Sequence, residues 1–186
     1  MSKNFFEIEN ASFTAGGKNK VNNVSLSIKN EGDIICLLGP SGIGKTTILR
    51  AIAGLEKLKN GKIILKNKVL SSKKIHIDPE DRNIALSFQE NSLFPHYTID
   101  KNINLGAERK IGKKRKISIK ETIKFLNLNK ILNKYPHEVS AGEAQRASLA
   151  RSLISQPDLL LLDEPLSNVD QSFKEEIQVQ LKKILN

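Results

Sequence analysis

The sequence predicts an α/β protein with a mixed-sheet core, an antiparallel β subdomain and a mainly helical insertion at about 90–140. Two apolar runs, Ile34–Leu38 and Leu159–Leu162, carry most of this prediction, because strands apolar on both faces are typical of a covered parallel sheet. The third observation is the helical spacing of apolar residues directly after the first run, from Thr46 to Leu55. A length of 186 residues suits one domain, 1–186, whose helical subdomain we place at about 95–155.

The remaining elements follow from local signals. Alternation at period two predicts half-buried strands at 5–9 and 24–28, and Asn67 marks the turn of a hairpin over 62–70. Gly54 predicts the end of the first helix, and Pro157 follows a strong helix over 140–155. We further expect a turn at 30–33, a strand at 84–88, helices over 98–133 broken by a loop at 110–116, a strand at 159–163 and a closing helix over 173–185.

Composition narrows the classes of function. Thirty basic and twenty acidic residues give a net charge of +10, which fits a nucleic-acid or anionic-membrane partner or simply a lysine-rich composition. Aromatic residues, on which nucleic-acid bases stack, make up only 5%, so we expect no nucleic-acid partner. One cysteine excludes an internal disulfide framework and a cysteine-rich zinc site, and no apolar run approaches the ~20 residues of a membrane span. We therefore expect an intracellular protein without a signal peptide.

A phosphate-binding motif follows the first apolar run. Residues 39–46 match G-x-x-x-x-G-K-[ST] between a predicted strand and a predicted helix, which is the context that its chemistry requires. Glycines let backbone N–H groups converge on one point, and the helix N-terminus adds positive potential there. Lys45 would reach the β- and γ-phosphates, Thr46 would bind Mg²⁺ and Thr47 would contact the α-phosphate region. The nucleotide-binding residues expected here are Gly39, Pro40, Ser41, Gly42, Ile43, Gly44, Lys45, Thr46 and Thr47, and the alternative is a glycine-rich turn without a ligand.

Two carboxylates end the second apolar run. Asp163 and Glu164 follow it at the carboxyl end of a predicted strand, where α/β sheets bind ligands. We expect Asp163 to bind Mg²⁺ through water, and Glu164, which faces the other way, to polarise the attacking water. The alternative is a strand followed by an acidic turn, and the upstream phosphate-binding motif disfavours it.

Three further segments resemble parts of the ABC-type ATPases. Ser140–Arg146 (SAGEAQR) resembles their signature segment, Ser87–Glu90 (SFQE) with Leu93–His96 (LFPH) their glutamine loop, and Leu166–Asp170 (LSNVD) their D-loop. With the phosphate loop and the paired carboxylates, five motifs in the family's order cover residues 5 to about 172. The runs 89–103 and 136–169 are most similar to the bacterial importers of ferric iron, polyamines, sugars and related solutes.

This resemblance implies a P-loop NTPase fold of ABC type and a head-to-tail homodimer that holds two ATP molecules between its subunits. Ser140 and Gly142 of one subunit, with Glu143 beside them, would face the γ-phosphate bound by the other. Ser140 and Glu143 also match a helix capping box, and the two roles are compatible. The resemblance also implies that Gln89 holds Mg²⁺ and the attacking water beside a permease. It implies that Phe13 stacks on adenine, with a core role as the alternative. Asp170 would lie across the dimer interface.

The sequence departs from the family pattern at the signature segment and at its end. Val139 replaces a leucine, Ala141 replaces the first glycine, and Glu143 replaces the commoner glutamine and adds negative charge, so we expect slower turnover. The family's switch histidine follows the strand after the one that ends at Asp163, and residues 1–186 stop before that strand. We therefore expect missing C-terminal strands, a longer reading frame and weak hydrolysis by this stretch alone. The histidines upstream that do not fill the role are His76, His96 and His137.

The leading hypothesis is the ATP-hydrolysing subunit of a bacterial importer, with ATP and Mg²⁺ as its ligands. Its expected partners are a second copy, permease subunits and, indirectly, a solute-binding protein. Its expected place is peripheral, at the cytoplasmic face of the inner membrane. The alternatives are a soluble ABC-type ATPase acting on nucleic acid or ribosomes, which the net charge suits, and a nucleotide-binding module without hydrolysis, which the absent histidine suits.

Overall fold

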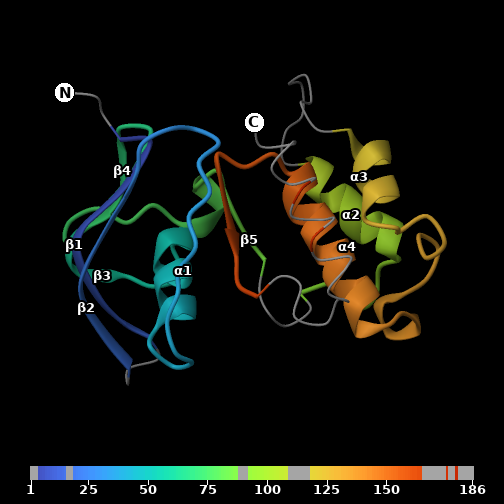
Figure 1. The fold of residues 1–186 in the computed structure, drawn as a ribbon, viewed down its shortest axis with the longest axis horizontal. Coiled ribbons are helices and arrows are strands. Elements are labelled where there is room, and N and C mark those ends of the chain that lie inside the picture. The colour runs from blue at the N-terminus through green and yellow to red at the C-terminus, as the bar shows by residue number, and fades with distance from the viewer. Residues whose placement is uncertain are drawn as a thin grey trace. The chain divides into compact units, whose positions relative to one another are not determined.

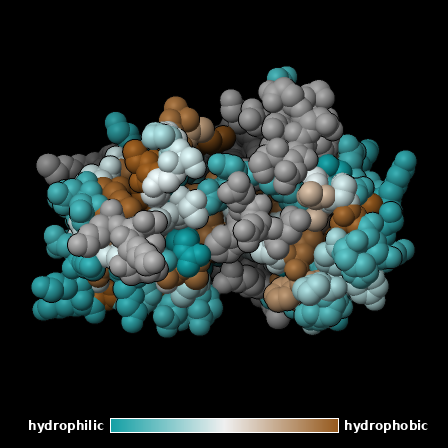
Figure 2. Space-filling model, turned by 90° about the horizontal axis from the view of Figure 1, so that it is seen from below, coloured by the Kyte–Doolittle hydropathy of each residue, from teal (hydrophilic) through white to brown (hydrophobic). Residues whose placement is uncertain are grey.

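The computed structural model describes residues 4–15, 19–87, 92–108 and 118–164, with positions 175 and 179 (Figure 1). The chain divides into two compact units, Met1–Asn83 and Ile84–Asn186. On the face seen in Figure 2, hydrophilic side chains predominate, and apolar ones lie in patches among them. Of the described helices, none has both the length and the apolar character that a membrane crossing needs.

The first unit is built on an antiparallel sheet. Its strands are β1 (Phe6–Ala15), β2 (Asn19–Ile28), β3 (Leu58–Leu65) and β4 (Lys68–Ser72), in the order β2-β1-β3-β4. The buried positions of β1 change parity, from Phe6 and Ile8 to Ala11 and Phe13. A bulge at Asn10, whose φ is +44°, lies between the two pairs and keeps the same face of the strand buried. The strands predicted at 5–9 and 24–28 are therefore confirmed as parts of longer strands.

A tight hairpin turn and one helix complete the first unit. Lys66 and Asn67, with φ of +48° and +65°, form the turn between β3 and β4, which confirms the turn predicted at Asn67. Helix α1 (Lys45–Ala53) ends at Gly54, whose φ of +92° is a common helix-terminating conformation, as predicted. A short 3-10 turn, η1 (Pro79–Asp81), precedes the end of the unit.

The prediction of a strand at 34–38 is wrong, because these residues form no strand in the structure. Residues 33–40 have no ladder partner among the described residues, and Ile34, Ile35 and Leu38 are 49%, 47% and 92% exposed. An apolar run becomes a strand only when neighbouring strands satisfy its backbone N–H and C=O groups, and the four-stranded sheet of this unit does not include it. The apolar composition alone therefore did not determine the pairing.

In its described stretches, the second unit combines two parallel strands with three helices. Strands β5 (Ile84–Ser87) and β6 (Leu159–Leu162) pair in register, with Ile84 opposite Leu159 and Ser87 opposite Leu162. The helices are α2 (Ile99–Glu108), α3 (Ile119–Phe125) and α4 (Ala141–Ile154), with a 3-10 turn, η2 (Pro136–Glu138), before α4. Beyond Phe125 the chain forms turns, so the helical prediction that extended to 133 is too long.

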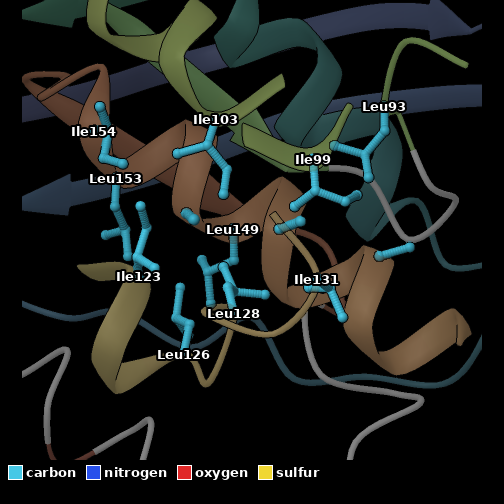
Figure 3. Close-up of a cluster of buried hydrophobic side chains, with 13 residues drawn as sticks. Leu93, Ile99, Ile103, Ile123, Leu126, Leu128, Ile131, Leu149, Leu153 and Ile154 are labelled. Atoms are coloured by element: carbon cyan, nitrogen blue, oxygen red, sulfur yellow. The ribbon is translucent and has the colours of Figure 1, made fainter. Parts of the chain in front are cut away.

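A cluster of apolar side chains holds these helices together (Figure 3). Ile99 and Ile103 from α2 meet Leu149 and Leu153 from α4, and all four are at most 1% exposed. Gly106 permits the close crossing of the two helices, because a Cβ there would collide with the carbonyl oxygen of Arg151. The helix predicted over 140–155 is confirmed, whereas the loop at 110–116 and the helix at 173–185 lie outside the described residues.

Candidate functional site

The phosphate-binding motif forms an open loop at the N-terminus of α1. Gly44 precedes the helix with a left-handed φ of +106°, and no side chain caps the first turn. At Gly42 the φ is +82°, and no atom lies within 4 Å of the place where a Cβ would be. Residues 39–43 are exposed, so the loop and the N–H groups of the helix N-terminus are accessible to an anion.

Lys45 places its charge at this loop. Its Nζ donates to the carbonyl oxygens of Gly39, at 2.7 Å, and of Pro40, at 2.9 Å. Thr46, the next residue, is exposed, whereas Thr47 is buried, with 8% of its surface exposed. The structure therefore brings together a cation, an accessible hydroxyl and an uncapped helix N-terminus, which suits a phosphate group.

The β1–β2 hairpin reaches the same loop. The Cγ2 atom of Val21 is 2.9 Å from the position of a Cβ at Gly44, and Val21 is paired with Phe13 in the ladder. The Phe13 ring is 1% exposed, so it has no free face on which adenine could stack in this structure. The expected stacking role of Phe13 is not met, because the ring packs in the core of the sheet, which was the alternative.

Asp163 and Glu164 occupy different environments at the end of β6. The Asp163 N–H donates to the carbonyl oxygen of Ser87 at 3.0 Å, which extends the β5–β6 pairing by one residue. Asp163 is 8% exposed and its carboxylate has no hydrogen-bond or ion-pair partner in the described part of the chain. Glu164 is exposed and has a φ of +48°, a strained conformation for a residue that is not glycine. The structure therefore places a mostly buried carboxylate next to an exposed one.

The signature segment forms the N-terminal end of α4. The Ser140 N–H donates to Oε2 of Glu143 at 2.8 Å, and the Glu143 N–H donates to Oγ of Ser140 at 3.2 Å, which confirms the predicted capping box. The hydrogen bond from the Ser140 N–H lowers the pKa of Glu143 below its ordinary value, although partial burial opposes the shift. Ser140 is exposed and Gly142 is buried.

A side-chain contact that the sequence did not indicate joins α4 to the two carboxylates. The Nε2 of Gln145 donates to the backbone oxygen of Glu164 at 3.1 Å. Gln145 lies within the signature segment, but a glutamine in a helix gives no sequence signal for such a distant partner. This hydrogen bond fixes the backbone carbonyl of Glu164, which is the strained residue with the exposed carboxylate.

Two of the predicted site residues, Gln89 and Asp170, lie outside the described residues, as does the D-loop. In the described ranges, no three histidine, cysteine, aspartate or glutamate side chains gather as a metal-binding cluster. The sequence also showed no sign of two arginines with little solvent exposure in the described units, the buried Arg82 and the half-buried Arg151. Arg151 donates to the carbonyl oxygen and to Oγ of Ser92, both at 2.8 Å, and burial lowers its pKa.

Together, the α/β units and the glycine loop at the start of α1 define a phosphate-loop protein. The model of the family described as "ABC transporter" matches residues 21–167, and the chain belongs to this family. The ferric-ion import ATP-binding protein FbpC of Fusobacterium nucleatum is 40% identical over 182 residues, and the match covers 97% of this chain and 48% of FbpC. The spermidine/putrescine import ATP-binding protein PotA of Nitrosospira multiformis is 41% identical over 177 residues, with 94% of this chain and 47% of PotA covered.

A solved structure of an ATP-binding cassette has a similar fold, which agrees with this family assignment. The ATP-binding cassette MJ0796, described as a dimer in a post-hydrolysis state bound to ADP and Pi, superposes with a TM-score of 0.81 at 28% identity. The match covers 97% of this chain and 83% of that chain. The present chain spans about half the length of FbpC and PotA, so it corresponds to only part of those importer proteins.

Proposed function

We propose that this chain binds Mg-ATP and hydrolyses it as the ATPase subunit of a bacterial importer. The phosphate loop carries the proposal, because Lys45, the left-handed glycines and the uncapped start of α1 form an accessible anion site. Relatives about 40% identical to the chain are import ATP-binding proteins for ferric ions and for spermidine and putrescine. The proposed solute class is therefore ferric iron or a polyamine, and the permease and binding protein select among solutes.

Mg²⁺ fits the donors that the chain offers. Magnesium is usually held by one or two carboxylates together with substrate phosphates and water. Asp163 supplies a mostly buried carboxylate without a cationic partner in the described residues, and Thr46 supplies an accessible hydroxyl. We propose these two residues, with Gln89, as the protein's magnesium donors. When bound, the ion neutralises charge on the phosphates.

The hydrolytic roles fall to the exposed carboxylate and the glutamine. Glu164 would accept a hydrogen bond from the attacking water, and its strained backbone, held by Gln145, would orient the carboxylate away from the buried position of Asp163. Lys45 would neutralise charge that develops on the β- and γ-phosphates. Gln89 would orient the water from the segment that follows β5.

The active form that we propose is a head-to-tail homodimer. Ser140 is exposed at the N-terminus of a fourteen-residue helix, where its hydroxyl can still donate a proton to a phosphate oxygen while Oγ accepts from Glu143. The ATP bound to one subunit would contact Ser140 and Gly142 of the other, with Asp170 across the interface. Support comes from MJ0796, whose structure is described as dimeric. The dimer would work on permease subunits at the cytoplasmic face of the inner membrane, with a solute-binding protein as an indirect partner.

No observation favours either alternative function. The net charge of +10 is the basis of the nucleic-acid alternative, whereas the relatives at about 40% identity are import ATP-binding proteins. A nucleotide-binding module without hydrolysis would retain the site but lack turnover. A hydrolysis assay separates the two proposals, because the importer proposal expects Mg-ATP turnover, even if weak for residues 1–186 alone, that Glu164→Gln slows further, whereas the module would show none.

The test of the phosphate site is Lys45→Ala. Because Lys45 is the side-chain cation that lies on the loop carbonyls, its removal should weaken Mg-ATP binding at least a hundredfold while the melting temperature changes little. Lys57→Ala, a change of an exposed lysine between α1 and β3, is the matched control and should bind like the parent. Equal affinities for the two variants would contradict the proposed function.

A further inference from the structure

Arg82 is the largest fully buried side chain of the described structure, although it is an arginine in a polar stretch after η1. It is 1% exposed. Arginines are rarely buried to this degree, because removing a guanidinium from water is costly unless all its N–H groups find acceptors. The segments that carry these acceptors are therefore held together by the buried side chain.

The guanidinium ties α1 to β4 and to the segment before η1. Its Nη1 donates to the carbonyl oxygens of Ala51, at 3.2 Å, and of Ile52, at 2.8 Å, in the last turn of α1. Its Nη2 donates to the carbonyl oxygen of Leu70, at 3.3 Å, and to Oγ of Ser71, at 2.6 Å, in β4. Its Nε donates to the carbonyl oxygen of Ile77 at 2.7 Å. These five hydrogen bonds equal the five N–H donors of an arginine.

The geometry of this contact is specific to arginine. A lysine has one point charge and three donors on a flexible stem, so it cannot reach acceptors on three segments with a planar fork. Gly54 makes room for the fork, because a Cβ there would lie 2.6 Å from Nε of Arg82. Burial lowers the pKa of Arg82 to about 10, although Asp78 opposes the shift, so the group stays charged at neutral pH. A cation also stabilises the C-terminal end of a helix dipole.

The opposite end of α1 carries the phosphate loop. The helix has nine residues, which corresponds to a length of about 13 Å, and its i→i−4 hydrogen bonds connect its last turn to its first. A shift of its last turn therefore displaces Lys45 and Thr46 at its first turn. We propose that Arg82 is a positioning residue of the nucleotide site, which holds α1 and its phosphate loop in register with the antiparallel sheet. This inference rests on the proposed function, because it assumes that the loop binds a nucleotide.

The test compares Arg82→Lys and Arg82→Gln with Arg50→Gln. Arg50 is the matched control, because it lies in the same last turn of α1 but is partly exposed and forms an ion pair with Glu56 at 3.1 Å. Mg-ATP affinity is measured by calorimetry at least 15 °C below each variant's melting midpoint, so that only folded protein is compared. Both Arg82 variants should bind at least tenfold more weakly than the parent, and the control should stay within twofold.

A second variant keeps the test decisive if Arg82→Gln does not fold. Gly54→Ala keeps Arg82 in the sequence, but its Cβ would displace the guanidinium and strain the helix end at a φ of +92°, so it should also weaken Mg-ATP binding at least fivefold. A purely structural Arg82 would give variants that melt earlier yet bind Mg-ATP within twofold of the parent, and this result would overturn the inference. The proposed function fails separately, if the parent chain itself does not bind Mg-ATP or if Lys45→Ala does not weaken the binding.

Discussion

Glu143 places a negative charge at the helix end where the partner's ATP would dock, and its removal should tighten the ATP-dependent dimer. Glu143→Gln keeps a side-chain oxygen that can accept from the Ser140 N–H, so the capping box should persist. The lowered pKa of Glu143 means that the carboxylate is fully ionised at neutral pH. The substitution therefore changes charge while it preserves the helix start.

The size of the effect follows from the position of the carboxylate. Glu143 Oε2 is 2.8 Å from the Ser140 nitrogen, and a phosphate bound to the Ser140 hydroxyl would lie one hydrogen bond further on. The two negative charges would then be about 6–8 Å apart, which gives a repulsion of roughly 0.6 kcal/mol in water and roughly 2.4 kcal/mol at an effective dielectric constant of about 20. At each of the two sites, neutralisation should thus tighten the contact roughly threefold to fiftyfold.

Sedimentation velocity can measure this change. The variant is made in a Glu164→Gln background, so that ATP is not consumed, and dimer formation is followed against protein concentration at low and high salt. Glu121→Gln, at the N-terminus of α3, removes the same charge from another helix start and serves as the control. The gain should shrink in high salt, because exposed charges are screened. A Glu143→Gln dimer no tighter than the control dimer at low salt would refute the reasoning.

Two further perturbations test the hydrolytic carboxylate and the helix crossing. Glu164→Gln should retain Mg-ATP binding, slow hydrolysis about 10²- to 10⁴-fold and accumulate an ATP-bound dimer in size-exclusion chromatography, because a water-polarising base contributes that much. Hydrolysis at the parent rate would assign the role to another residue. Gly106→Ala should lower stability by about 1–3 kcal/mol, which is a fall of about 2–12 °C in melting temperature, because its Cβ collides with the Arg151 carbonyl. An unchanged melting temperature would mean that α2 and α4 do not cross as closely as the structure shows.

Local signals in the sequence predicted local structure well. The turn at Asn67, the end of α1 at Gly54 and the capping box at Ser140 each depend on a few neighbouring residues, and all three are present. The predicted loop of the phosphate-binding motif is also present, because it too depends on neighbouring residues. Its conformation follows from glycines and a helix start within eight residues.

Long-range relations could not be predicted in the same way. The run at 34–38 has the composition of a buried strand, but its pairing depends on segments elsewhere, and the described sheets do not include it. The alternation of apolar and polar residues around Phe13 separates the two faces of the strand. It does not indicate whether the ring stacks on adenine or packs in the core. Arg82 lies in a charged stretch, and its acceptors in α1 and β4 are up to 31 residues away, so no local pattern marks it.

The pairing of β5 with β6 decides which of two adjacent acids is withdrawn from water. Side chains alternate between the faces of a strand, so a slip of one residue would turn β6, and Asp163 directly after it, toward the opposite face. The match of Ser87 with Leu162, and the bond from the Asp163 N–H to the Ser87 oxygen, hold the register that keeps Asp163 buried. A substitution that loosened this register, even far from either carboxylate, would thus bring Asp163 into water although both acids remained in the sequence.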